Sequence, residues 1–415
     1  MRTWTDNLPQ GWRVAHPKTL FRERREPSQR DDVHLTPSQH HGVLPQAEYM
    51  KRTGSKVVLN LAAPDNMKHV EPNDFVAHLR SFQGGIEKSS MRGKVSTAYT
   101  VISPLPEADP GFYRWALKSG AFISELAANC EQLRDGQSVK FGDFVRIRLP
   151  HPPLDEQRRI ADFLDDRVAC IDQIITARRQ QSAAVGRMSH AALSALLDEV
   201  GSRYGLAPLR RFCGGIEQGS SPVSDDRPAG PGEPGVIKTS AIQMGVFRAE
   251  QNKVMPADSV DPRYLIRSGD LLVTRGSGSA ELVGDAAVAV VPSDLMLYLS
   301  DLTYRIRLLE LDPVFTSLSI ISARGRAELG ARVRQGSGPA KARGEDILSI
   351  PVPAAPSADQ MAIARRASSD RTTMEKRRQQ LDLSIARLSE YKQSLITAAV
   401  SGELDVSTVG SGIPG

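Results

Sequence analysis

Two long stretches of the chain carry apolar residues every three or four positions, the spacing of one face of an α-helix. In the first stretch this face consists of Ile160, Leu164, Val168, Ile171 and Ile175. In the second it consists of Leu381, Ile385, Leu388 and Leu395. Arg, Lys, Gln and Glu flank both faces, so each apolar stripe is narrow and needs a partner to leave water. We expect the two helices to pack on each other as an antiparallel coiled coil.

Both helical stretches open with the same pattern at a constant separation of 203 residues, since residue 157 is matched by residue 360 and residue 160 by residue 363. The matched residues are Pro150, Pro153, Glu156, Gln157, Ile160 and Ala161 in the first copy and Pro353, Pro356, Asp359, Gln360, Ile363 and Ala364 in the second. Each copy runs for roughly forty residues to a glycine, Gly201 or Gly402, and carries the tetrad RRQQ, at 178–181 and 377–380. This separation is far too long for a solenoid. It indicates two modules, each followed by a long helix.

The start of each helix offers a capping residue. Ser357 and Gln360 predict a capping box at the second helix, and Asp155 is the expected cap of the first. A helix of about 45 residues spans roughly 65–70 Å at a rise of 1.5 Å per residue. That length can hold two modules well apart.

About 150 residues of a different pattern precede each helix. In the first module, β-branched and alternating residues predict strands at 57–61, 74–79 and 99–102, and helical spacing predicts a helix at 110–126. In the second module we expect strands at 269–274 and 285–291, a tight polar loop at 276–279 and an exposed loop at 222–234. The similar rhythm favours one fold used twice.

The predicted class is therefore α+β, with two similar α/β domains joined by two long helices in a pseudo-two-fold arrangement. The expected boundaries place the domains at 1–152 and 202–353, the helices at 153–201 and 354–405, and a disordered tail at 406–415.

Composition narrows the class of protein. At 415 residues, with 24% charged and 40% hydrophobic residues, the chain has ordinary soluble usage and room for two or three domains. Its net charge of +5 favours an anionic partner. The three cysteines lie far apart, which excludes a disulfide framework or a cysteine metal site. No apolar stretch approaches the ~18 residues of a membrane span, and no signal region opens the chain, so we expect a cytoplasmic protein.

Motifs for catalysis are missing from the sequence. There is no GxxxxGK[ST] or GxGxxG, and GSGS at 276–279 is better explained as a turn than as a nucleotide site. His41 and its neighbour His40 lack metal-ligand partners, and Asp74 with Glu87 and Lys88 lacks the spacing of a nuclease. Asp270 fits a turn residue, with a contact to a base as the alternative. We therefore expect no catalytic residue, no metal and no cofactor.

Basic and polar residues beside turns are the candidate chemistry. Arg and Gln can contact guanine and adenine edges with two hydrogen bonds, and Lys can contact phosphates. Any one of them could be a solvated surface residue, but their grouping beside Gly-rich turns favours DNA binding. The candidates are His78, Arg80, Gln83, Lys88, Arg92 and Lys94 in the first module and Thr274, Arg275, Ser277, Ser279, Arg332, Arg334, Lys341 and Arg343 in the second. Arginines on the long helices, such as Arg158, Arg159, Arg178 and Arg179, are expected to be solvated.

These features together resemble the specificity subunit of type I restriction-modification systems, over nearly the whole chain. The most specific segments are PPLDEQRRIADFLD at 152–165 and YKQSLITAAVSGELD at 391–405. NLPQGW at 7–12 and GDLLVTR at 269–275 also look like family features. The second copy departs from the pattern, because AAPSADQ at 354–360 has lost the Leu and has Asp in place of Glu.

The resemblance implies a division of labour. Each target-recognition domain would read one half of a bipartite sequence in double-stranded DNA, and the helices would set the spacer. The helices would also dock two DNA adenine methyltransferase subunits, and a helicase-nuclease restriction subunit would join for restriction. The specificity subunit would perform no chemistry, in keeping with the missing S-adenosylmethionine-binding and Asn-Pro-Pro-Tyr motifs.

Alternatives remain open at this point. The chain could serve a complex that only methylates, which the sequence does not distinguish from one that restricts. A DNA-processing enzyme with its own active site has only the weak carboxylate pattern in its favour. A coiled-coil adaptor that binds no DNA does not account for basic loops on two modules. The recognised sequence is not readable, because base choice depends on loop geometry and DNA shape.

Overall fold

The computed structural model describes residues 4–39, 41–54, 67–79, 81–129, 139–278, 282–333 and 340–408. The chain divides into two compact units. Unit 1 comprises residues 1–179 and 383–415, and unit 2 comprises residues 180–382. Each unit therefore combines a globular part with one portion of each long helix.

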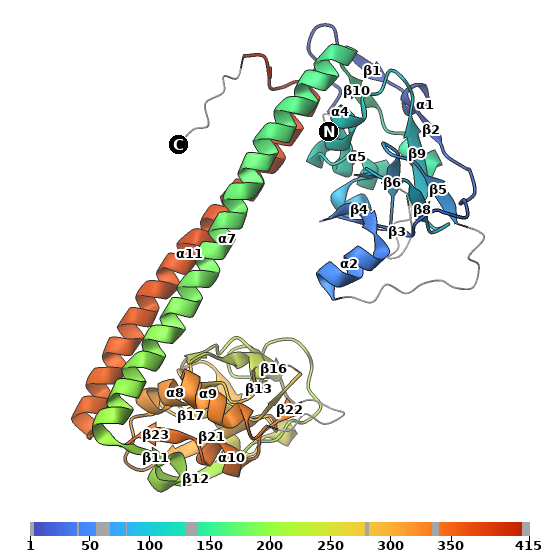
Figure 1. Cartoon of the computed structure of the whole chain (residues 1–415). Helices are drawn as coiled ribbons and strands as arrows, with labels where there is room; N and C mark the ends of the chain where they lie inside the picture. The colour runs from blue at the N-terminus through green and yellow to red at the C-terminus, as the bar shows by residue number, and fades with distance from the viewer. Residues whose placement is uncertain are drawn as a thin grey trace. The chain divides into compact units, whose positions relative to one another are not determined.

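Unit 1 is built on a four-stranded antiparallel sheet (Figure 1). Its strand order is β2 (Phe21–Glu23), β9 (Thr100–Pro104), β6 (Phe75–Ala77) and β7 (Glu87–Lys88). Three antiparallel pairs accompany it: β1 (Arg13–Ala15) with β10 (Leu149–His151), β3 (Leu35–Ser38) with β4 (Gly42–Pro45), and β5 (Lys68–Val70) with β8 (Gly93–Val95). The helices are α1 (Pro17–Leu20), α2 (Gln46–Thr53), α3 (Ser81–Gly84), α4 (Pro110–Ala116), α5 (Gly120–Asn129) and α6 (Phe141–Phe144).

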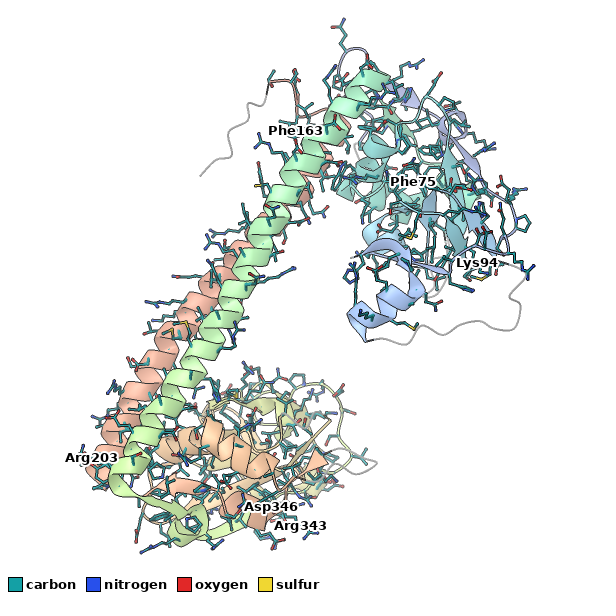
Figure 2. All side chains as sticks on the ribbon, viewed as in Figure 1. Phe75, Lys94, Phe163, Arg203, Arg343 and Asp346 are labelled. Atoms are coloured by element: carbon teal, nitrogen blue, oxygen red, sulfur yellow. The ribbon has the colours of Figure 1, made fainter. Side chains whose placement is uncertain are left out.

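Aromatic side chains fill the core of unit 1. The ring of Phe21 meets those of Phe75, Tyr113 and Phe144 edge-on, with centroids 5.0–5.8 Å apart, an arrangement that aromatic quadrupoles favour. Figure 2 shows Phe75 inside this core. The same apolar cluster continues into the long helices through Leu164 and Ile396, among others. The globular part and the helix portions thus share one core.

Unit 2 contains a four-stranded antiparallel sheet in the order β12 (Cys213–Gln218), β21 (Thr303–Leu308), β17 (Leu271–Thr274) and β19 (Ala286–Val288). A second sheet places β13 (Pro234–Ile237) between β16 (Asn252–Val254) and the parallel β20 (Met296–Tyr298). The remaining pairs are β11 (Leu206–Pro208) with β23 (Pro351–Pro353), β14 (Ile242–Gln243) with β15 (Val246–Phe247), and β18 (Gly276–Ser277) with β22 (Ala340–Lys341). The helices are α8 (Pro313–Ile321), α9 (Ala323–Gly330) and α10 (Gly344–Leu348), with 3₁₀ turns at Leu209–Phe212, Thr239–Ala241, Ala257–Ser259 and Pro262–Tyr264.

The main sheets of the two units have the same strand order along the chain. In each, the first strand along the chain pairs with the last, the last also pairs with the second, and the second also pairs with the third. The registers agree as well, since Phe75 lies opposite Ile102 in unit 1 and Leu271 lies opposite Ile306 in unit 2. Three helices follow each sheet, α4 to α6 in unit 1 and α8 to α10 in unit 2.

The long helices are α7 (Leu154–Tyr204) and α11 (Ser357–Ser401), which lie side by side in Figure 1. In unit 1 the start of α7 packs with the end of α11, and in unit 2 the end of α7 packs with the start of α11. Side-chain bonds join them at Lys392–Asp172 and at Ser182–Asp382. Asp172 lies ten residues before Ser182 and Lys392 ten residues after Asp382, so both bonds fit one antiparallel register.

The apolar stripes predicted for the long helices are confirmed in the first helix and only partly in the second. All five predicted residues of α7, 160, 164, 168, 171 and 175, are buried. In α11 the predicted Leu381, Ile385, Leu388 and Leu395 are half-buried, and Ile396, Ala399 and Val400 are the buried residues at that end. The four arginines expected to be solvated, at 158, 159, 178 and 179, are exposed.

Three predictions about helix ends are wrong. The first long helix continues past Gly201 to Tyr204, and Gly205 follows it at φ +78°, a left-handed conformation that glycine adopts at no steric cost. Gly402, with φ +77°, does end the second helix as predicted. The capping box of Ser357 and Gln360 is also wrong, because the Gln360 side chain bonds residues outside its own helix. Asp155 lies inside the first turn of α7 rather than at its cap.

Other elements differ in extent. The helix predicted at 110–126 is two helices, because Ser119 accepts a bond from the Phe122 N–H and starts α5. The strands predicted at 74–79, 99–102, 269–274 and 285–291 correspond to β6, β9, β17 and β19, while the one at 57–61 lies outside the described residues. The start of the loop predicted at 276–279 pairs as β18 instead. In the part of the chain that the structure describes, no helix is long and apolar enough to cross a membrane.

Candidate nucleic-acid interface

Several predicted DNA-binding residues of unit 1 are already engaged within the unit. The Arg92 guanidinium donates to Asp32 at 3.2 Å, to Asp31 at 3.1 Å and to Gln29. The Lys88 ammonium donates to Asn73 at 3.1 Å. Burial lowers the pKa of Lys88, and the positive charge of the neighbouring Arg114 lowers it further. Arg92 and Lys88 therefore first serve the local structure, and a phosphate contact would compete with these partners.

The remaining unit 1 candidates differ in accessibility. His78 is buried, and its N–H donates to the Ser81 hydroxyl at 2.8 Å. Gln83 is exposed, and Lys94 on β8 is half-buried (Figure 2). Arg80 lies outside the described residues. Gln83 and Lys94 are thus the unit 1 candidates with side chains placed to meet a ligand.

The sequence did not indicate that His69 is a buried, hydrogen-bonded residue of unit 1. Both ring nitrogens of His69 form hydrogen bonds. Nδ1 lies 2.7 Å from Oδ2 of Asp32, and Nε2 lies 2.7 Å from Oε1 of Glu71. Burial opposes protonation of His69, but the two hydrogen bonds and the two carboxylate charges outweigh it and raise its pKa. Asp32, His69 and Arg92 come from positions up to sixty residues apart, so no local pattern announces the cluster.

In unit 2 two candidates face inward. Thr274 is fully buried, and its hydroxyl donates to the Leu282 carbonyl at 2.6 Å. Ser277 is buried on β18. Both residues shape the end of the sheet rather than present a free hydroxyl. Ser279 and Arg334 lie outside the described residues.

Arg275 sits at the centre of a polar sheet edge in unit 2. Its guanidinium lies over the Tyr304 ring, 5.8 Å from the centroid, and donates to the Asp301 carbonyl at 3.4 Å. Its Nε is buried and has no partner among the described residues. An unpaired buried N–H is costly for the folded state. Arginine over an aromatic ring is also held in a defined plane.

Neighbouring strands bring further polar groups to the same edge, which the sequence did not indicate. Gln218, at the end of β12, donates to the Asp301 carbonyl at 3.1 Å, and Ser221 donates to the Asp301 carboxylate at 2.5 Å. Pairing of β18 with β22 sets Gly276 opposite the exposed Lys341. We call Arg275, Gln218, Ser221, Asp301 and Lys341 the unit 2 edge. It offers donors and acceptors of the kind that base edges match.

Arg332 and Arg343, the last two candidates, are exposed and loosely held. Arg332 donates to Glu328 at 2.9 Å, and Arg343 donates to Glu345 at 3.3 Å. Exposed pairs of this kind contribute about 0–1 kcal/mol, so either arginine can exchange its partner for a phosphate. Arg343 also precedes α10, where its backbone N–H donates to Asp346 at 2.9 Å (Figure 2).

Structural partners bind Asp74, part of the weak nuclease pattern, and Asp270, the predicted turn residue. Asp74 accepts from Arg24 at 2.6 Å, from Ser103 at 2.6 Å and from the Glu71 N–H at 2.8 Å. Asp270 accepts from the Arg267 N–H at 2.9 Å, which confirms its prediction as a turn residue. Left-handed residues, Asn73 and Gly269, precede the two aspartates. Among the described residues no group of three His, Cys, Asp or Glu side chains could hold a metal ion.

Comparisons with known proteins find sequence similarity to type I specificity subunits. No family model matches it. It is 26% identical over 322 residues to the "Type I restriction enzyme EcoKI specificity subunit" of Escherichia coli K12, covering 73% of this chain and 68% of that protein. It is 32% identical over 113 residues to the EcoEI specificity subunit of Escherichia coli, covering 26% of this chain and 18% of that protein. The chain is a homologue of type I specificity subunits.

Solved structures agree with this relationship at the level of the fold. A chain from a study of "complex assembly and conformational transition of the type I R-M system" matches with a TM-score of 0.71 at 18% identity, covering 96% of this chain and all of that one. The HsdS subunit from Thermoanaerobacter tengcongensis matches with a TM-score of 0.52 at 19% identity, covering 97% of this chain and all of that one. These specificity subunits share the mixture of sheets and long helices found here. The resemblance inferred from the segments at 152–165 and 391–405 is therefore confirmed.

Proposed function

We propose that this chain is the DNA-specificity subunit of a type I restriction-modification complex, in which each unit reads one half of a bipartite sequence. The observation that carries the proposal is the repeated sheet, with one strand order in both units and the same three helices after it. A protein with two similar reading sites suits an asymmetric, two-part target. The homology to specificity subunits supports the same conclusion.

The proposed domains are residues 1–152 and 205–353, related by a pseudo-two-fold axis, with helices at Leu154–Tyr204 and Ser357–Ser401 and a tail at 406–415. In this scheme the helices act as an antiparallel coiled coil that sets the spacer between the half-sites. The bonds Ser182–Asp382 and Lys392–Asp172, in one register, support that role.

The DNA-contacting residues of this proposal are the accessible members of the predicted set. They are Gln83 and Lys94 in unit 1 and Arg275, Lys341, Arg332 and Arg343 in unit 2. Gln218 and Ser221 join them through the unit 2 edge. The buried residues Thr274, Ser277 and His78 act by supporting these strand ends.

The proposed partners follow from the same role. Two DNA adenine methyltransferase subunits would dock on the long helices, and a helicase-nuclease subunit would join them in the bacterial cytoplasm. The specificity subunit would contribute no catalytic group of its own. Its carboxylates at Asp74 and Asp270 support this, because each is taken up by arginine and backbone N–H donors.

The test is co-expression of this chain with a type I DNA adenine methyltransferase subunit, in a host without adenine methylation, followed by mapping of methylated adenines. We expect one bipartite motif, with an adenine in each half and a spacer of fixed length. The matched control expresses the methyltransferase alone. A contiguous motif, or the same methylation without this chain, would contradict the proposal.

A further inference from the structure

A buried glutamine ties the globular part of unit 1 to its long helix. The Gln157 side chain, on the first turn of α7, is 0% exposed. Its Oε1 accepts the Asp109 N–H at 2.8 Å, and its Nε2 donates to the Pro152 carbonyl at 2.9 Å. One side chain thus joins the segment before α4, the segment after β10 and the long helix.

Unit 2 repeats the arrangement with different residues. The Gln360 side chain, on the first turn of α11, is 3% exposed. Its Oε1 accepts the Asp312 N–H at 2.6 Å, and its Nε2 donates to the Ala355 carbonyl at 2.7 Å. The two acceptor bonds each link residues 48 positions apart. We call these two arrangements the glutamine bridges.

Each bridge acts on a residue that itself starts a helix. The Asp109 carboxylate accepts the Phe112 N–H at 2.9 Å, and the Asp312 carboxylate accepts the Phe315 N–H at 2.8 Å. The side chain of each aspartate therefore caps α4 or α8, while its backbone N–H is held by the long helix. This couples the first helix of the globular part to the long helix through two consecutive hydrogen bonds.

The chemistry requires glutamine at these positions. The Gln360 site presents one backbone donor and one backbone acceptor, and in the Gln157 site Nε2 also donates to the Glu107 carbonyl at 3.1 Å. An amide matches donor and acceptors while remaining uncharged. A glutamate would leave the carbonyl without a donor and would bury a charge. An apolar side chain would leave a buried N–H and a buried carbonyl unsatisfied. These bonds therefore explain why both copies have glutamine at the matching position. The first turn of a helix does not otherwise need a glutamine.

We propose that Gln157 and Gln360 are positioning residues that fix the orientation of each recognition domain on its long helix and so determine which spacer length the subunit accepts. This inference rests on the proposed function. One base pair changes the separation of two half-sites by about 3.4 Å and their relative rotation by about 35°. A coiled coil of constant length can discriminate such a step only when each domain is rigidly joined to it. The glutamine bridges supply that rigid joint.

Exposed contacts between each globular part and α7 provide control variants. In unit 1, Asp165 on α7 accepts from Trp115 at 2.7 Å and from Arg114. In unit 2, Asp198 on α7 accepts from Arg324 at 2.8 Å. Asp165 is 44% and Asp198 50% exposed, so both can exchange their partner for water. They should not control orientation.

The experiment uses the whole complex of this chain with its methyltransferase subunits. DNA duplexes carry the mapped half-sites with the native spacer, one base pair fewer, and one or two base pairs more. Methylation rates are compared for wild type, Gln157→Met, Gln360→Met, Asp165→Asn and Asp198→Asn. Methionine is close to glutamine in volume and removes the hydrogen bonds of the amide.

We expect the preference of the wild type for its native spacer to fall by about tenfold or more in each methionine variant, because a tenfold change requires only 1.4 kcal/mol. The half-site sequences should not change, and the two asparagine variants should keep the wild-type preference. Gln157→Asn and Gln360→Asn, which stay uncharged and polar but are one methylene too short to hold both ends of the bridge, serve if a methionine variant does not fold; they should show the same loss.

Two results would contradict either the inference about the glutamine bridges or the proposed function. If the methionine variants are slower by one factor on every spacer, the glutamines only stabilise the fold and the inference is overturned. If the wild type itself shows no preference among spacers, the proposed function has failed rather than the inference about the bridges. The ratio between spacers is the decisive quantity, since general destabilisation leaves it unchanged.

Discussion

The Arg305 guanidinium forms a buried ion pair with the Asp270 carboxylate, with Nη1 and Oδ2 3.1 Å apart. The same guanidinium donates to Glu217 and to the carbonyls of Leu265 and Arg263, the last two at 2.7 Å. Its side chain is 2% exposed. With five donors and five such bonds, Arg305 holds the middle of the unit 2 sheet and is not available to DNA.

Replacing Arg305 should destabilise unit 2 strongly. In Arg305→Met, Asp270 and Glu217 lose their buried partner, and breaking a buried pair in this way costs about 3–5 kcal/mol. Arg307→Met is the matched control, because Arg307 bonds the same two carboxylates but is 47% exposed and should cost about 1 kcal/mol or less. Hydrogen exchange of the β21 amides in increasing urea measures both. Equal losses in the two variants would show that burial is not the deciding factor.

Substitutions at the two candidate surfaces should act on one half-site each. Arg275→Ala removes the guanidinium from the unit 2 edge. It should lower the discrimination between bases at one position of one half-site by about 1–3 kcal/mol, the value of a bidentate contact. Lys94→Ala, in unit 1, should affect only the other half-site. Methylome sequencing of each variant measures this. A single substitution that altered both halves would defeat the modular interpretation.

Two histidines of unit 1 should give opposite dependences of stability on pH. The pKa of His69 is raised above 6.5: burial opposes protonation, but the bonds and charges of Asp32 and Glu71 outweigh it. The stability that His69 contributes is therefore fully present below pH 6.5 and is lost as pH rises through the raised pKa. The pKa of His151 is lowered by burial and by Arg13, with Glu107 opposing. Its contribution is present above pH 6.5 and is lost as pH falls through the lowered pKa.

Urea unfolding of unit 1 between about pH 5 and pH 8 tests both signs. His69→Gln should remove the loss of stability toward alkaline pH, and His151→Gln should remove part of the loss toward acid pH. Each variant is the control for the other, since both histidines lie in one unit. The assignment of charge would be reversed if His69→Gln flattened the acid side instead.

The purified chain should transfer no methyl group and cut no DNA on its own. The reason is the absence of catalytic motifs from the sequence and the structural use of Asp74 and Asp270. Incubation with radiolabelled S-adenosylmethionine and duplex DNA checks the first point, and plasmid cleavage with ATP and magnesium checks the second. Methyl transfer by a homogeneous preparation would refute this expectation.

The long helices were predictable because their signal is repeated and periodic. A buried stripe such as Leu164 and Val168 follows from helical spacing alone, and the constant separation of Gln157 and Gln360 marks both helix starts. The spacing did not reveal what these glutamines do. Their partners, Asp109 and Asp312, lie 48 residues earlier, where only the fold brings them close.

The candidate DNA-binding residues were less predictable for a related reason. Thr274 looks like a ligand-facing residue at a strand end, yet its hydroxyl is satisfied by the Leu282 carbonyl inside the unit. Arg92 looks free in sequence, yet Asp32 holds it from sixty residues away. Whether a polar side chain points to solvent or to a buried partner is decided by tertiary contacts. Composition and turn signals identify the regions but do not choose the residues within them.

We expect the long helices to set the length of the spacer. Four residues inserted into α11 between Asp382 and Leu383, and four into α7 between Gln181 and Ser182, would enter at opposite points of the antiparallel register. Both helix portions of each unit would keep their partners. Four residues add about 6 Å of rise and rotate the helix by about 40°, which corresponds to nearly two base pairs at about 3.4 Å each. We expect the mapped motif to keep both half-sites and to gain a longer spacer, with DNA twist or bending taking up the rotation.

Insertion into α11 alone is the control: it displaces one helix against the other and should reduce activity without a defined new spacer. A proline at the same point of α11 should kink the helix, at a cost of about 3 kcal/mol or more, and weaken recognition of the combined site. Genome-wide mapping of methylated adenines reads out all three variants. A doubly extended subunit that kept full activity on the original spacer would show that the helices do not set it.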